Sequence, residues 1–160
     1  MSKFKFYFLS FTWGLPVTLA GCLVAFFMRI TGHKPKKWGY CYYFELGNGH
    51  SGADFGVFFV KGKPESLYLK NHELGHAVQN CYFGFLMPFI VNIPSTVRFW
   101  FRAFSKRINP QKKLKPYDSV WFEGQATRLG SKLISHLESE NLKNNKTPPY
   151  KDENFENKGL

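Results

Sequence analysis

The sequence predicts an α+β fold: a small domain with a short β-hairpin and two functional helices, placed behind an N-terminal membrane helix. Three observations predict it. Residues 7–28 form an apolar run without charge. Two runs rich in β-forming residues, 38–46 and 54–60, flank a glycine-rich link. Two further segments, 67–82 and 119–137, have the residue patterns of helices.

The length of 160 residues fits one domain with additions at both ends. We divide the chain into an N-terminal membrane anchor at 1–31, a folded domain at 32–137 and a polar tail at 138–160. From about Glu138 the sequence is rich in Asn, Lys, Glu and Pro and poor in apolar residues. Such a segment buries too little apolar surface to fold, so we expect the tail to be disordered.

The apolar run 7–28 is long enough for a helix that spans a bilayer, which needs about 20 residues. A lipoprotein-type signal is the alternative, because Leu19-Ala20-Gly21-Cys22 resembles a bacterial processing box. The run continues to Met28, past Cys22, which favours an uncleaved single span. More cations follow the run than precede it, so the positive-inside rule predicts a membrane protein whose body faces the cytoplasm. These cations are Lys3 and Lys5 before the run and Arg29, Lys34, Lys36 and Lys37 after it.

The net charge of +11 and the aromatic content of 19% both suit contact with a membrane surface. A basic chain attracts either lipid headgroups or nucleic acid, but this one has no nucleic-acid-binding signature. Its basic clusters flank apolar segments, one of which is 81–97. We therefore predict membrane lipid as a partner and no nucleic acid. The 81–97 segment is either an interfacial element or a broken core helix.

The sharpest chemical signal is His72-Glu73-Leu74-Gly75-His76, an HExxH motif within the expected 67–82 helix. Residues four apart lie on one face of a helix, so both imidazoles can bind one zinc ion. Glu73 points to the side, where it can act as a general base toward zinc-activated water. The three cysteines form no CxxC pair, so a cysteine-based zinc site is not expected.

Glu123 is the predicted third metal ligand, on the expected 119–137 helix. A carboxylate that faces a core is costly unless it is paired or binds a metal. Two histidines and one glutamate are a known catalytic zinc set with one open position. The face of Glu123 continues through small or apolar residues: Ala126, Thr127, Gly130, Leu133 and Leu137.

Two alternatives to this assignment remain. Glu123 can form a surface salt bridge with Arg128 or Lys132. In that case Asp118 or His136 is the third metal ligand in place of Glu123.

The pattern His72-Glu73-xx-His76 followed by Glu123-xx-Ala126 resembles that of gluzincin metallopeptidases. The long stretch between His76 and Glu123 is closer to the membrane-bound, HtpX-like members than to the thermolysin-like ones. The chain also resembles small bacterial membrane proteins that share the TWGLP, NHExGHxxQN, IPS and WFEGQA stretches. The resemblance implies a minimal zincin-like domain. Many gluzincins have Asp where this chain has Thr127, so Asp118 or a backbone carbonyl is expected to orient a ligand histidine.

The resemblance further implies a sheet edge beside the metal, where a substrate backbone can pair as an added strand. The 54–60 strand is the candidate. A donor should also stabilise the oxyanion that forms during attack. Tyr117 and His50 are the candidates for that role, with Tyr43 as a further alternative.

These observations predict a membrane-anchored zinc-dependent hydrolase with a peptide or protein substrate. An intramembrane protease is disfavoured, because Lys70, Asn71 and Glu73 would be buried in its membrane helix. The alternative function is a non-catalytic, membrane-associated interaction protein with a structural or vestigial metal site.

Overall fold

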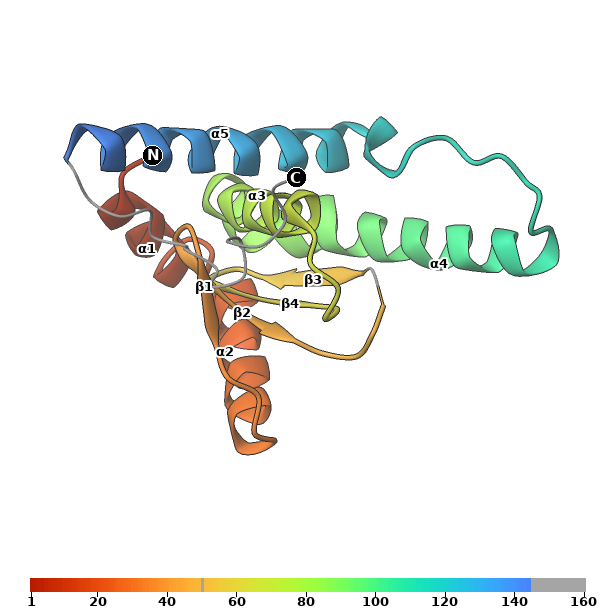
Figure 1. The fold of residues 1–160 in the computed structure, drawn as a ribbon, viewed down its shortest axis with the longest axis horizontal. Coiled ribbons are helices and arrows are strands. Elements are labelled where there is room, and N and C mark those ends of the chain that lie inside the picture. Colours follow the sequence, from red (N-terminus) through yellow and green to blue (C-terminus); the bar gives the residue numbers. More distant parts are fainter. Residues whose placement is uncertain (50, 145–160) are drawn as a thin grey trace, which may run out of the picture.

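The computed structural model describes residues 1–49 and 51–144, and its fold is α+β, as predicted. Helix α3 (Leu67–Phe83) lies between a four-stranded sheet and helix α5 (Trp121–Lys143), as Figure 1 shows. Helices α1 (Lys3–Phe11) and α2 (Leu15–Ile30) lie at the sheet side of the molecule. Helix α4 (Ile93–Ile108) extends away from the body as an arm.

The sheet is mixed, which corrects the expected hairpin of 38–46 with 54–60. Its strands are β1 (Lys36–Trp38), β2 (Cys41–Glu45), β3 (Gly52–Phe55) and β4 (Phe58–Lys61), in the order β1-β2-β4-β3. Gly56, with φ of 73°, reverses the chain inside the second run, a conformation that costs glycine little. β3 and β4 therefore pair antiparallel with each other, while β4 pairs with β2 in parallel. As a result β3 is an edge strand.

The N-terminal apolar run forms two helices instead of the expected single one, and they are bent by 92°. Pro16 in the first turn of α2 has no N–H, which is tolerated there but would break a continuous helix. Asn80 of α3 donates to the carbonyl of Gly14 at 3.1 Å and so holds the bend against the body. Among the described residues no single helix has the length and apolarity to cross a membrane, although the bent α1–α2 pair has them jointly.

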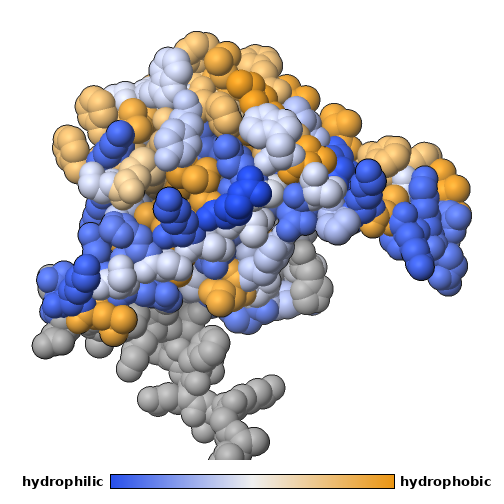
Figure 2. All heavy atoms as spheres, turned by 90° about the horizontal axis from the view of Figure 1, so that it is seen from above, coloured by the Kyte–Doolittle hydropathy of each residue, from blue (hydrophilic) through white to orange (hydrophobic). Residues whose placement is uncertain are grey.

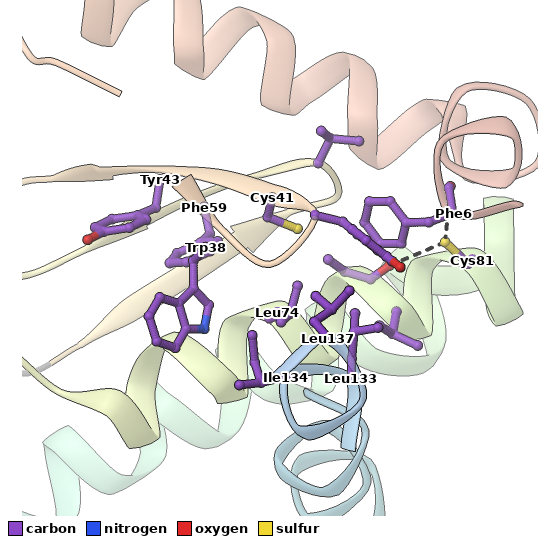
Figure 3. Close-up of a cluster of buried hydrophobic side chains, with 14 residues drawn as sticks. Phe6, Trp38, Cys41, Tyr43, Phe59, Leu74, Cys81, Leu133, Ile134 and Leu137 are labelled. Atoms are coloured by element: carbon purple, nitrogen blue, oxygen red, sulfur yellow. Dashed lines mark hydrogen bonds between the residues drawn. The ribbon is translucent and has the colours of Figure 1, made fainter. Parts of the chain in front are cut away.

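The main core joins residues from α1, the sheet, α3 and α5, as Figure 3 shows. Phe6 of α1 is fully buried in this cluster, where its carbonyl accepts a hydrogen bond from Cys81. The 1–31 segment, expected as a separate anchor, therefore shares its core with the domain. The labelled members of the cluster are Phe6, Trp38, Cys41, Tyr43, Phe59, Leu74, Cys81, Leu133, Ile134 and Leu137.

Two glycines allow α3 and α5 to pack closely. A Cβ on Gly75 would overlap the carbonyl oxygen of Ala126, and a Cβ on Gly130 would overlap the carbonyl oxygen of Asn71. Because neither position has a side chain, the two backbones approach each other directly. This contact brings Glu123, near the start of α5, against the middle of α3.

Between α3 and α4 the helical path is irregular. Residues Gly84–Leu86 form a 3-10 helix, η1, and Pro88–Asn92 form a π-helical turn, η2. Pro94, in the first turn of α4, cannot donate to the carbonyl one turn earlier, which favours the wider turn before it. The 81–97 segment thus contains the end of α3, the two irregular turns η1 and η2, and the start of the amphipathic helix α4.

The C-terminal helix starts later and ends later than predicted. A short 3-10 helix, η3 (Tyr117–Ser119), precedes α5 and contains Asp118. α5 continues to Lys143, which corrects the expected disorder of residues 138–143. His136 and Glu140, an i,i+4 pair at 3.4 Å, support this added length on the helix surface. The remainder of the predicted tail, 145–160, lies outside the described residues.

Candidate metal centre

Helix α3 carries the HExxH motif into the interior of the protein. The Ser66 side chain caps the helix by accepting a hydrogen bond from the N–H of Leu69, which satisfies one of the free donors of the first turn. His72, Glu73 and His76 are 5%, 4% and 6% exposed. The motif is therefore helical and buried.

Three ligand atoms converge between α3 and α5. The Nε2 atoms of His72 and His76 are 3.1 Å apart. Oε2 of Glu123 lies 3.1 Å from the first and 3.2 Å from the second. Ligand atoms about 2.0–2.1 Å from a tetrahedral zinc ion lie about 3.4 Å from one another, so the triangle has the right size. The buried group of His72, His76 and Glu123 could hold a metal ion.

Each ligand side chain is oriented by a further hydrogen bond. Nδ1 of His72 bonds to Oγ1 of Thr127 at 2.9 Å, and Nδ1 of His76 bonds to Oε1 of Gln79 at 2.8 Å. Ser95 donates to Oε1 of Glu123 at 2.6 Å. These contacts leave both Nε2 atoms and Oε2 facing the centre, the arrangement that outer partners give to metal ligands.

The electrostatics of the site pair a basic histidine with an acidic glutamate. Burial alone would lower the pKa of His76, but its hydrogen bond to Glu123 and the nearby charges of Glu73 and Asp54 raise that pKa to about 9. Burial alone would raise the pKa of Glu123, but hydrogen bonds from His72, His76 and Ser95 bring it well below its ordinary value. Because a ligand imidazole must be neutral, a metal ion has to replace the proton on His76.

Glu73 faces a pocket of about 930 Å³ beside the three ligands. Burial raises the pKa of its carboxyl, against the opposing charges of His76 and His72. The carboxylate packs against Gly52 of β3. Residues 51–55, which include the whole edge strand, form one wall of the pocket, and α4 forms another. The expected edge strand beside the site is therefore β3 rather than the full 54–60 run.

Tyr117, one of the predicted oxyanion stabilisers, lines this pocket. Its ring centre is 6.1 Å from that of His72, and its hydroxyl is 3.1 Å from Oγ of Ser95. Burial raises the pKa of Tyr117 to about 12, so the hydroxyl keeps its proton at neutral pH. Tyr43 instead lies in the core, stacked on Phe59. His50 lies outside the described residues.

The alternatives for Glu123 and the third ligand do not fit the geometry. Glu123 is fully buried and pairs with the two histidines rather than with Arg128 or Lys132. Asp118 is exposed. His136 lies on the outer surface of α5, paired with Glu140.

Sequence reasoning missed several residues that support the site. Thr127 replaces the partner expected from Asp118 or a backbone carbonyl, and Gln79 orients a candidate ligand histidine. Their positions, four residues after Glu123 and three after His76, place them on the ligand faces, so helical spacing was the available signal. Ser95 belongs to a different helix, and no local pattern connects it to Glu123.

A further carboxylate, that of Asp54, lies near the site. Asp54 of β3 lines the pocket and accepts a hydrogen bond from the N–H of Gly56 at 3.1 Å. Its Oδ1 atom has no hydrogen-bond partner in the described structure. Burial raises the pKa of its carboxyl well above the ordinary value.

The chain was compared with models of known protein families, with curated proteins and with solved structures. None of them matches.

Proposed function

We propose that this protein is a membrane-anchored, zinc-dependent hydrolase, and that it is a peptidase of the gluzincin kind with a minimal zincin-like domain. The observation that carries the proposal is the triangle of His72, His76 and Glu123 with Glu73 beside it in an open pocket. The donor set of two imidazoles and one carboxylate suits zinc. Such a set leaves one coordination position free for chemistry.

A bound zinc ion would supply Lewis acidity, which polarises a carbonyl and lowers the pKa of a bound water molecule to about 7. Glu73 then acts as the base that takes a proton from the attacking water, and it returns this proton to the leaving amine. Its burial raises its pKa, which makes the carboxyl a better proton acceptor than an exposed glutamate. The protonated hydroxyl of Tyr117 can donate to the oxyanion.

The edge strand β3 supports a peptide as the substrate. β3 bonds to β4 on one side, and the described sheet has no strand on its other side. An extended peptide can add to that edge through backbone hydrogen bonds. Because residues 51–55 line the pocket, a peptide paired there would pass beside Glu73.

The exposed apolar surface of α2 supports the membrane part of the proposal. Its members recur on one helical face and are between 43% and 63% exposed. This helix and α1 together have the length and composition of a span. The flanking cations favour a body on the cytoplasmic side. The exposed residues are Leu15, Leu19, Leu23, Phe26, Phe27 and Ile30.

Metal content and turnover of the purified protein test the proposal. Elemental mass spectrometry should find near one zinc per chain in the wild type and a sharp loss in His76→Ala and Glu123→Ala. Glu73→Gln should keep zinc but lose at least a hundredfold in cleavage of a quenched fluorescent peptide library. Zinc without any cleavage in the wild type would favour the non-catalytic alternative. A wild type free of zinc after zinc-supplemented purification would refute the hydrolase.

A further inference from the structure

Helix α4 exposes a continuous apolar face. Six of its large apolar residues lie within an arc of about 100° on a helix of 3.6 residues per turn. Each of them is between 54% and 69% exposed. They are Ile93, Val97, Trp100, Phe101, Phe104 and Ile108. A contiguous stripe of this size on a protein surface indicates a binding surface rather than contact with water.

The other side of α4 lines the metal pocket. Ser95, Phe99, Arg102 and Lys106 are among the pocket residues that α4 contributes. All six, which also include Thr96 and Ala103, are centred about 150° from the apolar face. From residue 92 to residue 106 the lining extends along about 21 Å of helix, at 1.5 Å per residue. A single helix therefore separates the pocket from whatever covers the apolar face.

The charge around α4 identifies what covers this face. Between Glu73 and Asp118 the sequence contains no Asp or Glu, whereas it contains seven Lys and Arg residues. They are Arg98, Arg102, Lys106, Arg107, Lys112, Lys113 and Lys115. The ammonium of Lys112 lies 5.9 Å from the ring centre of Phe101, so cations border the apolar stripe directly.

An anionic lipid surface matches both features, because it takes apolar side chains below its headgroups and attracts the cations around them. A second copy of this chain matches less well, since each copy has a net charge of +11. In the view of Figure 2, hydrophobic side chains gather along the upper rim of the molecule. The arm that α4 forms at the right has hydrophilic residues on its lower side.

We infer that α4 binds the surface of an anionic lipid bilayer through its apolar face, so that the metal pocket on the other side of the helix opens at the membrane surface. This contact is separate from the α1–α2 anchor. The role of the pocket rests on the proposed function, whereas the lipid contact does not require zinc. The substrate class that follows is a polypeptide held at the membrane surface.

Quenching of tryptophan fluorescence by brominated lipid tests the contact. The full chain is reconstituted into phosphatidylcholine vesicles that contain one third phosphatidylglycerol, with bromine on the acyl chains. Trp100 is 65% exposed at the centre of the apolar face, whereas Trp121 is 56% exposed on α5 and serves as the matched control. We expect Trp100→Phe to lose at least half of the quenched fluorescence and Trp121→Phe to lose little of it.

The anionic lipid requirement has its own test. Replacing Lys112, Lys113 and Lys115 by Gln should weaken binding of the chain to anionic vesicles on the order of a hundredfold, since each cation near such a surface contributes about fivefold. Binding to pure phosphatidylcholine vesicles should not change. Equal binding of the triple variant and the wild type to anionic vesicles would overturn the lipid selectivity.

Other outcomes would point elsewhere. Unquenched Trp100 in reconstituted protein overturns the inference, and an accompanying dimer that Trp100→Ser/Phe104→Ser dissociates would assign the face to a second copy. Zinc content is measured on the same samples. Quenched Trp100 without zinc contradicts only the proposed hydrolase, whereas bound zinc with unquenched Trp100 contradicts only the lipid contact.

Discussion

The hydrogen bond between Nδ1 of His72 and the hydroxyl of Thr127 can be removed with almost no change in side-chain shape by Thr127→Val. The bond is 2.9 Å long, and His72 is buried, so Nδ1 is left without its partner. Loss of an outer partner of a metal ligand costs 10- to 100-fold in metal affinity, which corresponds to about 1.4–2.7 kcal/mol. We therefore expect the Kd for zinc to rise by this factor, measured by competition with a chromogenic chelator.

Two controls separate this effect from general damage to α5. Thr127→Ser keeps the hydroxyl and should keep the affinity within a few fold. Ser135→Ala removes a hydroxyl that bonds only to the backbone of the same helix, at 3.0 Å from the carbonyl of Ser131, and it should bind zinc like the wild type. An unchanged Kd in Thr127→Val would refute the view that Thr127 orients His72.

Three further predictions follow from the site and its packing. Gly75→Ala should destabilise the protein by about 3 kcal/mol in chemical denaturation, because the new Cβ would overlap the carbonyl oxygen of Ala126; an unchanged midpoint would contradict the close α3–α5 contact. Zinc binding should release one proton per chain and tighten about tenfold from pH 7 to pH 8, because the pKa of His76 without metal is about 9 and the imidazole must be neutral to bind. Calorimetry in buffers of different ionisation enthalpy measures that proton. Tyr117→Phe should reduce kcat about a hundredfold with unchanged zinc content, if its hydroxyl donates to the oxyanion; equal kcat would remove Tyr117 from that role.

The parts of the site that lie on single helices were predictable from sequence. The i,i+4 spacing of His72 and His76 fixes their common face, and the apolar neighbours of Glu123 one and two turns along α5 favoured a buried carboxylate. The structure brings these three side chains together as expected. Ser95 was not predictable, because its contact with Glu123 joins the first turn of α4 to a distant part of the sequence.

Two of the errors in the fold have a common cause: they depend on contacts between distant segments. A glycine at position 56 is compatible with a strand or with a turn. The parallel pairing of β4 with β2 requires the chain to turn there. The apolar run 7–28 has the composition of one helix, but the Asn80 side chain holds the break at Gly14. Polar residues after Glu138 suggested disorder, although they suit the exposed last turns of α5.

The hydroxyl of Ser95 makes α4 part of the candidate metal centre, because this residue of α4 donates a hydrogen bond of 2.6 Å to Glu123. If α4 shifted at a membrane surface, the hydrogen bond of Ser95 would change the position of Glu123, a candidate metal ligand. Thermodynamic linkage makes such coupling reciprocal. If lipid changes the affinity for zinc by some factor, zinc must change the affinity for lipid by the same factor, so the loaded protein and the metal-free protein would distribute differently between membrane and water.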